Sequence, residues 1–186
     1  MMKVLGIVCS PRKGGNTEIL VKASLAKARE AGAEIELVTL AGKTVNPCDA
    51  CYSCKKTGKC HIKDDMQDIY TKLLDSQGII FGTPVYFYSL CAQAKALIDR
   101  TFLFSEKREL QNKVAAFIVA TGRTGSTSAL AVFNAFAIGQ KMTVVGRAVG
   151  FGGREKDAVL KDARGLDEAE TLGATLVTKC FSYTTQ

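Results

Sequence analysis

Regular structure in this sequence begins with the apolar run Lys3-Val4-Leu5-Gly6-Ile7-Val8-Cys9, followed directly by Ser10-Pro11-Arg12-Lys13-Gly14-Gly15-Asn16-Thr17. The first seven residues predict a buried strand, since a short apolar run that ends at turn residues is typical of one. A helix is expected from Thr17 to Gly32, with Asn16 or Thr17 as its cap. A buried strand that leads through a glycine-rich loop into a helix predicts an α/β protein.

The alternation of strand and helix continues to the C-terminus. Further strands are expected at residues 34–40, 78–83, 113–120 and 143–150, the second of these stopping at Pro84. Helices are expected at residues 64–77, 90–104 and 126–140, and a last one at 157–180 that is broken near Gly165. Continuous apolar strands separated by helices imply a parallel sheet covered on both faces. We therefore predict a flavodoxin-like, doubly wound five-stranded parallel sheet of order 2-1-3-4-5.

Length and composition bound the protein class. The 186 residues, 47% apolar and 23% charged, predict a single domain over 1–186 with a cysteine-rich loop at about 46–62. No apolar run approaches the roughly 20 residues that span a bilayer, and the N-terminus lacks a signal-peptide pattern, so we expect a cytoplasmic protein without a membrane partner. The net charge of +7 is shared by both halves and no nucleic-acid module is recognisable, which argues against nucleic acid as a partner.

Three loops should meet at the carboxyl ends of the strands, where doubly wound sheets bind their ligands. The first offers cations, glycines and a helix N-terminus to a phosphate, and its candidate ligands are Ser10, Arg12, Lys13, Gly15, Asn16 and Thr17. The second places three consecutive aromatic residues at a strand end and consists of Pro84, Val85, Tyr86, Phe87, Tyr88 and Ser89. The third contributes Thr121, Gly122 and Arg123.

Together the three loops predict a site for one phosphate and one flat ring, which is the chemistry of FMN. A dinucleotide is disfavoured because no Gly-x-Gly-x-x-Gly follows the first strand. The alternatives are a solvated strand–helix turn for the first loop and ordinary core packing for the aromatic residues of the second.

Four of the seven cysteines fall within 13 residues, at Cys48, Cys51, Cys54 and Cys60. This dense run resembles iron–sulfur ligand sets more than zinc sites, which usually combine two separated Cys-x2-4-Cys pairs. One [4Fe–4S] cluster is the leading interpretation; cysteines without a cluster, a zinc ion and a disulfide are the alternatives. Five lysines against Asp49 alone between Lys43 and Lys63 would offset a negative cluster or attract an acidic partner, or form an ordinary solvated loop.

The other cysteines, Cys9, Cys91 and Cys180, are expected to be buried small hydrophobic residues, and the single histidine, His61, receives no role. An odd cysteine count without a secretory signal argues against a disulfide framework.

The sequence resembles the NADPH-dependent FMN reductase superfamily, and within it the iron–sulfur flavoproteins, over nearly its whole length. The resemblance rests on Ser-x-Arg-x-x-Gly-Asn-Thr at 10–17, the cysteine-rich loop ending in Asp64-Asp65-Met66, Gly82-Thr83-Pro84-Val85-Tyr86, Asp99-Arg100 and Leu172-Gly173. It implies that the first loop binds the FMN phosphate, that residues 84–89 line the isoalloxazine and that residues 121–123 close over it. It also implies a [4Fe–4S] cluster on the four clustered cysteines and a homodimer or homotetramer with FMN near a subunit interface.

We therefore expect an FMN-dependent oxidoreductase that passes electrons from a donor such as ferredoxin, through a [4Fe–4S] cluster, to FMN and on to a small acceptor such as a quinone, oxygen or peroxide. No side-chain acid, base or nucleophile is needed, so no catalytic residue is predicted. Two alternatives stay open. One is an NAD(P)H-dependent FMN or quinone reductase without a cluster, and the other is a flavin-binding redox sensor with a zinc or thiol switch.

Overall fold

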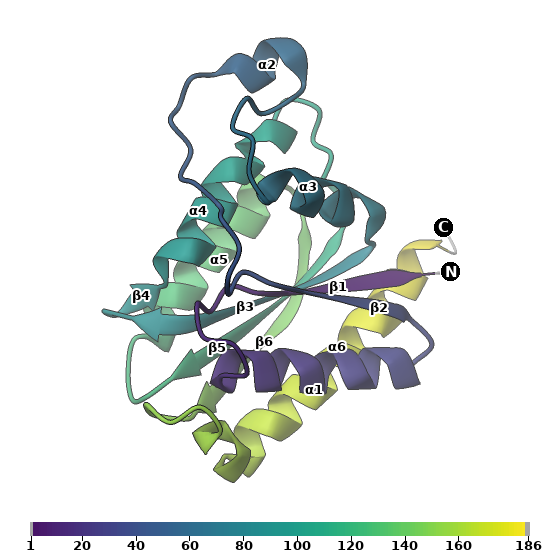
Figure 1. Ribbon diagram of the computed structural model, residues 1–186. Coiled ribbons are helices and arrows are strands. Elements are labelled where there is room, and N and C mark those ends of the chain that lie inside the picture. The colour runs from purple at the N-terminus through teal and green to yellow at the C-terminus, as the bar shows by residue number, and fades with distance from the viewer. Residues whose placement is uncertain (1, 185–186) are drawn as a thin grey trace.

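The central sheet of the computed structural model, which describes residues 2–184, has its parallel strands in the order β2-β1-β3-β5-β6 (Figure 1). These strands are β1 (Lys3–Val8), β2 (Glu34–Thr39), β3 (Gly78–Tyr86), β5 (Val114–Thr121) and β6 (Thr143–Phe151). The predicted order 2-1-3-4-5 is confirmed. A two-residue strand, β4 (Ser89–Leu90), pairs antiparallel with the end of β3 and was not predicted.

Helices cover both faces of the sheet. The helices α1 (Asn16–Glu30) and α6 (Ala163–Thr184) lie on one face, and α3 (Met66–Asp75), α4 (Ala92–Arg100) and α5 (Ser126–Gly139) on the other (Figure 1). The shorter elements are α2 (Ser53–Thr57) and the 3-10 helices η1 (Thr101–Phe104) and η2 (Ala158–Lys161). Within residues 2–184, no helix combines the length and the apolar character needed to cross a bilayer.

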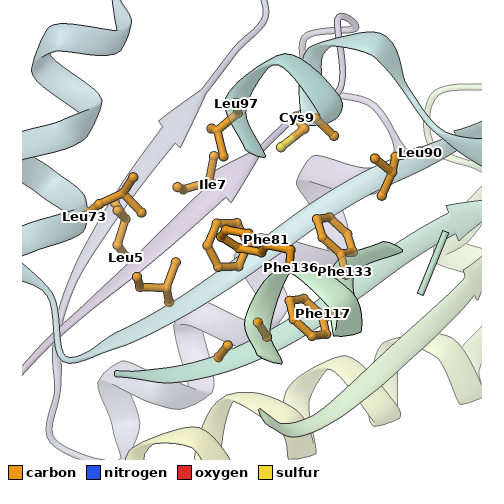
Figure 2. Close-up of a cluster of buried hydrophobic side chains, with 14 of the residues drawn as sticks. Leu5, Ile7, Cys9, Leu73, Phe81, Leu90, Leu97, Phe117, Phe133 and Phe136 are labelled. Atoms are coloured by element: carbon orange, nitrogen blue, oxygen red, sulfur yellow. The ribbon is translucent and has the colours of Figure 1, made fainter. Parts of the chain in front are cut away.

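The larger core lies between the sheet and the helices α3, α4 and α5. Figure 2 shows Phe81 of β3 at its centre, beside Phe117 of β5 and two phenylalanines of α5. The rings of Phe117 and Phe133 stack with their centroids 4.8 Å apart, and Phe136 meets Phe81 edge to face. Each such side chain contributes about 1.5–3 kcal/mol when fully buried, so the sheet is a rigid support for the loops at its carboxyl edge.

The predicted end of the third strand is wrong, and the cause is local. Strand β3 does not stop at Pro84 but continues to Tyr86. Its neighbour β1 pairs with it only as far as Gly82, so β3 has no partner strand on that side at Pro84. Proline has no backbone N–H to donate, and at this position no hydrogen bond between strands is lost. The last predicted helix is interrupted as expected, but at Asp162, between η2 and the start of α6 at Ala163. Glycine is needed at 165 since a Cβ there would lie 2.8 Å from the Cα of Gly150.

Candidate functional site

The first predicted loop connects β1 to the N-terminus of α1. Ser10 is buried, and its Oγ accepts a hydrogen bond from the backbone N–H of Arg12 at 3.1 Å. The loop turns at Gly14, whose φ of 64° favours glycine. The Gly14 N–H donates to the Glu18 carboxylate at 2.7 Å, so the loop presents a backbone donor to a negative oxygen. With the positive end of a 15-residue helix behind it, this loop has the chemistry of an anion site.

Asn16 does not cap the helix as predicted; the residue before α1 is Gly15, and it has no side-chain cap. The Asn16 amide nitrogen donates to the carbonyl oxygens of Gly152 at 3.2 Å and Glu155 at 2.8 Å, and its Oδ1 accepts from the N–H of Val159 at 3.2 Å. Asn16 thereby holds the segment 152–159 against the first predicted loop, residues 10–17, which is called the phosphate loop after its predicted ligand.

Arg12 makes a further contact with this segment, because its Nη1 donates to the carbonyl oxygen of Arg154 at 2.7 Å. The segment therefore places another exposed cation, Arg154, near the predicted phosphate site. Arg154 is absent from the residues predicted for the site. The available signal was Gly152-Gly153-Arg154 directly after the last strand, at the edge where the other loops were expected to meet.

The second loop is a hairpin in which β3 turns back as β4 at Phe87 and Tyr88. Both residues have positive φ, 44° and 67°, in a region where glycine or asparagine is usual and other residues pay roughly 1–2 kcal/mol each. Their rings are 95% and 60% exposed and meet edge to face. A strained turn that presents two aromatic rings to the outside is typical of a binding surface rather than of core packing.

The predicted loops contact one another through glycines. A Cβ on Gly125, whose φ is 95°, would lie 2.9 Å from the Cα of Tyr88, so the third loop packs directly on the hairpin. Gly122 faces Gly153, and the Gly152 N–H donates to the carbonyl oxygen of Thr121 at 3.1 Å. The hairpin, the third loop, the segment 152–159 and the phosphate loop thus form one connected edge, which fits a ligand with a flat ring and a phosphate. Arg123 lies exposed in the third loop.

The cysteine-rich loop follows β2 and projects above α3 and α4, with α2 within it (Figure 1). Ala50, Tyr52 and Gly58 have positive φ of 56°, 58° and 68°, so the chain turns sharply three times within it. Its four cysteines line one cavity of about 480 Å³, which is completed by residues of α4, η1 and α5 that include Ile98, Phe102 and Phe136. Four cysteines that line a single cavity fit a group held by four thiolates. Burial raises the pKa of the Cys54 thiol, and coordination would favour the thiolate instead.

Two neighbours of these cysteines carry polar groups that the sequence analysis left without a role. The ring nitrogen Nε2 of His61 lies 2.7 Å from Asp49 Oδ2, and the backbone N–H of Cys51 donates to Asp49 Oδ1 at 3.2 Å. Hydrogen bonds from Cys51 and His61 lower the pKa of the Asp49 carboxyl. The donor atoms of Asp49, Cys51 and His61 all lie within 4.8 Å of one another, close enough to hold a single metal ion.

The other three cysteines are buried, as predicted. Cys9 lies in the core of Figure 2, and Cys91 precedes α4 and donates its thiol hydrogen to the carbonyl oxygen of Cys9 at 3.2 Å. Desolvation raises the pKa of both thiols and brings that of Cys180 to about 11. These groups are poor nucleophiles and poor metal ligands at neutral pH.

Comparisons with known proteins agree with this geometry. Residues 2–156 match the family described as NADPH-dependent FMN reductase. An iron–sulfur flavoprotein of Methanocaldococcus jannaschii is 44% identical over 148 residues, which are 78% of this chain and 76% of that protein. An iron–sulfur flavoprotein of Archaeoglobus fulgidus is 34% identical over 166 residues, which are 87% of this chain and 76% of that protein.

The solved structures support the fold. RosB, solved with bound 8-demethyl-8-formylriboflavin-5'-phosphate, superimposes with a TM-score of 0.82 at 14% identity, covering 100% of this chain and 81% of that chain. An archaeal flavodoxin superimposes with a TM-score of 0.65 at 16% identity, covering 97% of this chain and 99% of that one.

Proposed function

The chain belongs to the iron–sulfur flavoproteins of the NADPH-dependent FMN reductase family, which are flavin-dependent oxidoreductases, and we propose that it transfers electrons in the cytoplasm from an acidic carrier such as a ferredoxin to a small acceptor. When bound, a [4Fe–4S] cluster would supply single-electron chemistry and FMN would supply one- or two-electron chemistry toward a quinone, oxygen or peroxide. The observation that carries the proposal is the cavity that all four clustered cysteines share.

The protein's residues supply binding and electrostatics in this scheme. Cys48, Cys51, Cys54 and Cys60 would hold the cluster, and the phosphate loop with Arg12 and Lys13 would hold the FMN phosphate. The hairpin rings of Phe87 and Tyr88 would contact the flavin. No side chain in these loops has to move a proton, so the chain acts by holding the two groups and limiting their access to solvent.

The lysines of the cysteine loop support an acidic electron donor. Lys56, Lys59 and Lys63 are exposed around the cysteines, while Lys55 is paired with Glu106 at 2.9 Å. A basic surface beside a redox group accelerates encounter with an acidic carrier in a salt-dependent way. The double variant Lys56→Glu/Lys59→Glu should slow reduction by an acidic ferredoxin about tenfold or more at low salt. Lys56→Glu alone is compared with Arg29→Glu on α1, which reverses one charge likewise and should not slow the reaction; equal effects of these two single variants would contradict a docking site at the loop.

We propose that a second copy of this chain packs against α5 in an oligomer. This helix has no charged residue from Ser126 to Gly139, and it leaves Ile138 74% exposed. A helix that has no charged residue and exposes a large apolar side chain fits a subunit interface, where charged residues are depleted. In one chain, α4 separates the hairpin from the cysteine loop by nine residues, about 14 Å, so an interface would offer a second route between the two sites. Measured by analytical ultracentrifugation, the unmodified protein should be a dimer or tetramer and Ile138→Glu should be a monomer. A monomeric unmodified protein would overturn this proposal.

A second candidate function keeps the flavin and replaces the cluster by a single metal ion. The observation that favours it is the group Asp49, Cys51 and His61, whose mixture of carboxylate, thiol and imidazole is one that zinc accepts. A reductase that takes electrons directly from NAD(P)H would likewise need no cluster.

One preparation separates these functions. The protein is purified without oxygen and analysed for iron, acid-labile sulfide, zinc and FMN per chain, with its absorption spectrum. About four irons and four sulfides support the proposal, zinc without iron supports the second candidate, and FMN without either metal supports the NAD(P)H-dependent reductase. Cys54→Ser should lose the cluster and keep FMN, whereas Ser53→Ala, its neighbour in α2, should keep both. Equal metal contents in the two variants would contradict cysteine ligation.

A further inference from the structure

The base of the cysteine loop is held by one buried side chain. Arg100 ends α4, and its guanidinium group is completely buried. It donates to the carbonyl oxygen of Asn46 at 2.9 Å, two residues before the first cysteine, and to that of Ile62 at 3.3 Å, two residues after the last. It also donates to both oxygens of Asp64, at 2.7 and 3.1 Å. A single guanidinium therefore joins the entry and the exit of the loop.

Asp64 completes this closure from the other side. Its Oδ2 accepts from the backbone N–H of Asn46 at 2.8 Å and from the Asn46 side chain at 3.2 Å, while its Oδ1 accepts from the N–H of Met66 at 3.1 Å. The Asp64 side chain is only 2% exposed, so the carboxylate and the guanidinium share a site with almost no water. The Asp64 carboxylate thus binds Arg100, Asn46 and the first residue of α3 together.

Tyr70 links this ion pair to the last cysteine. The Arg100 Nε donates to the Tyr70 hydroxyl at 3.2 Å, and that hydroxyl donates to the Arg100 carbonyl oxygen at 3.1 Å. Tyr70 is buried and its side chain contacts that of Cys60. Cys60 is therefore positioned by its neighbours in sequence and also by a residue of α3.

The tip of the loop rests on the segment that follows Arg100. The rings of Tyr52 and Phe102 meet edge to face with centroids 5.8 Å apart, and the Lys55 ammonium lies 5.5 Å from the centroid of the Phe102 ring. The same ammonium pairs with Glu106 at 2.9 Å. Residues 100–106 thus contact the loop at its base and at its tip.

From these contacts we propose that Arg100 is a positioning residue for the metal site. By tying both ends of the loop to α4, it brings the four thiols to one cavity before any metal binds, which removes much of the entropy cost of gathering four ligands. Lysine cannot replace it, because only the planar fork of arginine reaches two carboxylate oxygens and two carbonyls together. The inference rests on the proposed function only in taking these thiols as cluster ligands.

The first test uses the cluster-free, reduced protein and needs no metal. Arg100→Gln, Arg100→Lys and Lys95→Gln are compared by hydrogen exchange at Asn46, whose N–H is bonded to Asp64. Exchange should be at least tenfold faster in both Arg100 variants. It should be unchanged in Lys95→Gln, which removes an exposed ion pair with Asp99 from the same helix. Exchange at the original rate in both Arg100 variants would overturn the proposal.

The second test reconstitutes the same proteins with iron and sulfide. The Arg100 variants should lose iron to a chelator at least tenfold faster than the unmodified protein, with an altered electron paramagnetic resonance signal of the reduced cluster and an unchanged FMN content. Iron loss at the original rate in Arg100→Lys would contradict the need for the fork. If the unmodified protein binds no iron, the proposed function fails, while the exchange result still decides the role of Arg100. If Arg100→Gln does not fold, Arg100→Lys decides both tests.

Discussion

The side-chain nitrogen of Asn16 lies 2.8 Å from the carbonyl oxygen of Glu155, and this bond is one of three by which the Asn16 side chain joins the phosphate loop to the segment 152–159. Asn16→Ala removes all three and leaves the carbonyls of Gly152 and Glu155 with fewer partners, so the segment should open more often and FMN should bind about ten times more weakly. Fluorescence titration with FMN measures this. Asn134→Ala, an exposed position on α5, is the control. Equal affinities in the two variants would show that the segment has no part in the site.

The hairpin should be more stable with glycine at its tip. Tyr88 has a φ of 67°, which costs roughly 1–2 kcal/mol for a non-glycine residue. Glycine removes this cost, but it loses more backbone entropy on folding, and that loss offsets part of the gain in stability. We expect Tyr88→Gly to raise the free energy of unfolding by about 0.5–1 kcal/mol and to weaken FMN binding. Urea denaturation and flavin titration measure the two effects. Tyr88→Phe, which keeps the ring, should keep the affinity; tighter FMN binding by Tyr88→Gly would contradict a ring contact.

The contact between the third loop and the hairpin leaves no space for a side chain. Gly125→Ala combines a φ of 95° with a Cβ 2.7 Å from Val85 Cγ1 and 2.9 Å from the Tyr88 backbone, and it should lower the free energy of unfolding by about 2–3 kcal/mol. Gly139→Ala at the other end of α5 meets no atom within 4 Å and should be neutral or slightly stabilising. The free energy of unfolding is measured by urea denaturation. Equal losses in both variants would mean that the atoms around residue 125 move aside without cost.

Of the seven cysteine thiols, four should react with an alkylating reagent and three should be protected by burial. In the cluster-free, reduced protein at pH 8, iodoacetamide should modify Cys48, Cys51, Cys54 and Cys60, with Cys54 the slower because burial raises its pKa. The buried Cys9, Cys91 and Cys180 should react only after denaturation. Peptide mass spectrometry counts the labelled sites, and early labelling of any buried cysteine would contradict the described core.

The buried ion pair should make stability depend on acidity. Although desolvation opposes it, the hydrogen bonds from Arg100 and Asn46 keep the pKa of Asp64 below its ordinary value. A lowered folded pKa means that the pair stabilises the protein above about pH 4, the unfolded value, and that this contribution is lost as the pH falls through the folded pKa.

Asp64→Asn should therefore cost about 3–5 kcal/mol at neutral pH, since it leaves Arg100 buried without its counter-charge, and less at pH 3, where the carboxyl of the unfolded chain is mostly protonated. Urea denaturation at the two pH values measures this difference. Asp99→Asn, which breaks an exposed pair on α4, should cost at most about 1 kcal/mol at either pH. A loss in Asp64→Asn that is the same at pH 7 and pH 3 would contradict a charged carboxylate at this position.

The sequence predicted the sheet and its helices because apolar periodicity reports burial directly, and β1, α1, β5 and α5 lie within one residue or two of their expected bounds. It missed features that depend on contacts between distant residues. Nothing near Asn16 indicates that its amide would bind carbonyls more than 130 residues away, and nothing near Arg100 indicates a partner at Asp64. The strand through Pro84 was missed for the same reason, because it depends on where the neighbouring strand ends.

The closure at Arg100 has a consequence for how such a protein can be altered. The chain leaves the body at Asn46 and returns at Asp64, and these two residues are hydrogen-bonded to each other. The segment between them therefore begins and ends at adjacent points of the structure, and it contributes no strand to the sheet. A short turn grafted between these two residues should leave the flavin edge intact, and a foreign metal-binding insert of suitable length should be accepted at the same two residues. The fold thus allows a metal-binding insert to be gained, lost or exchanged without rebuilding the sheet or the three loops at its carboxyl edge.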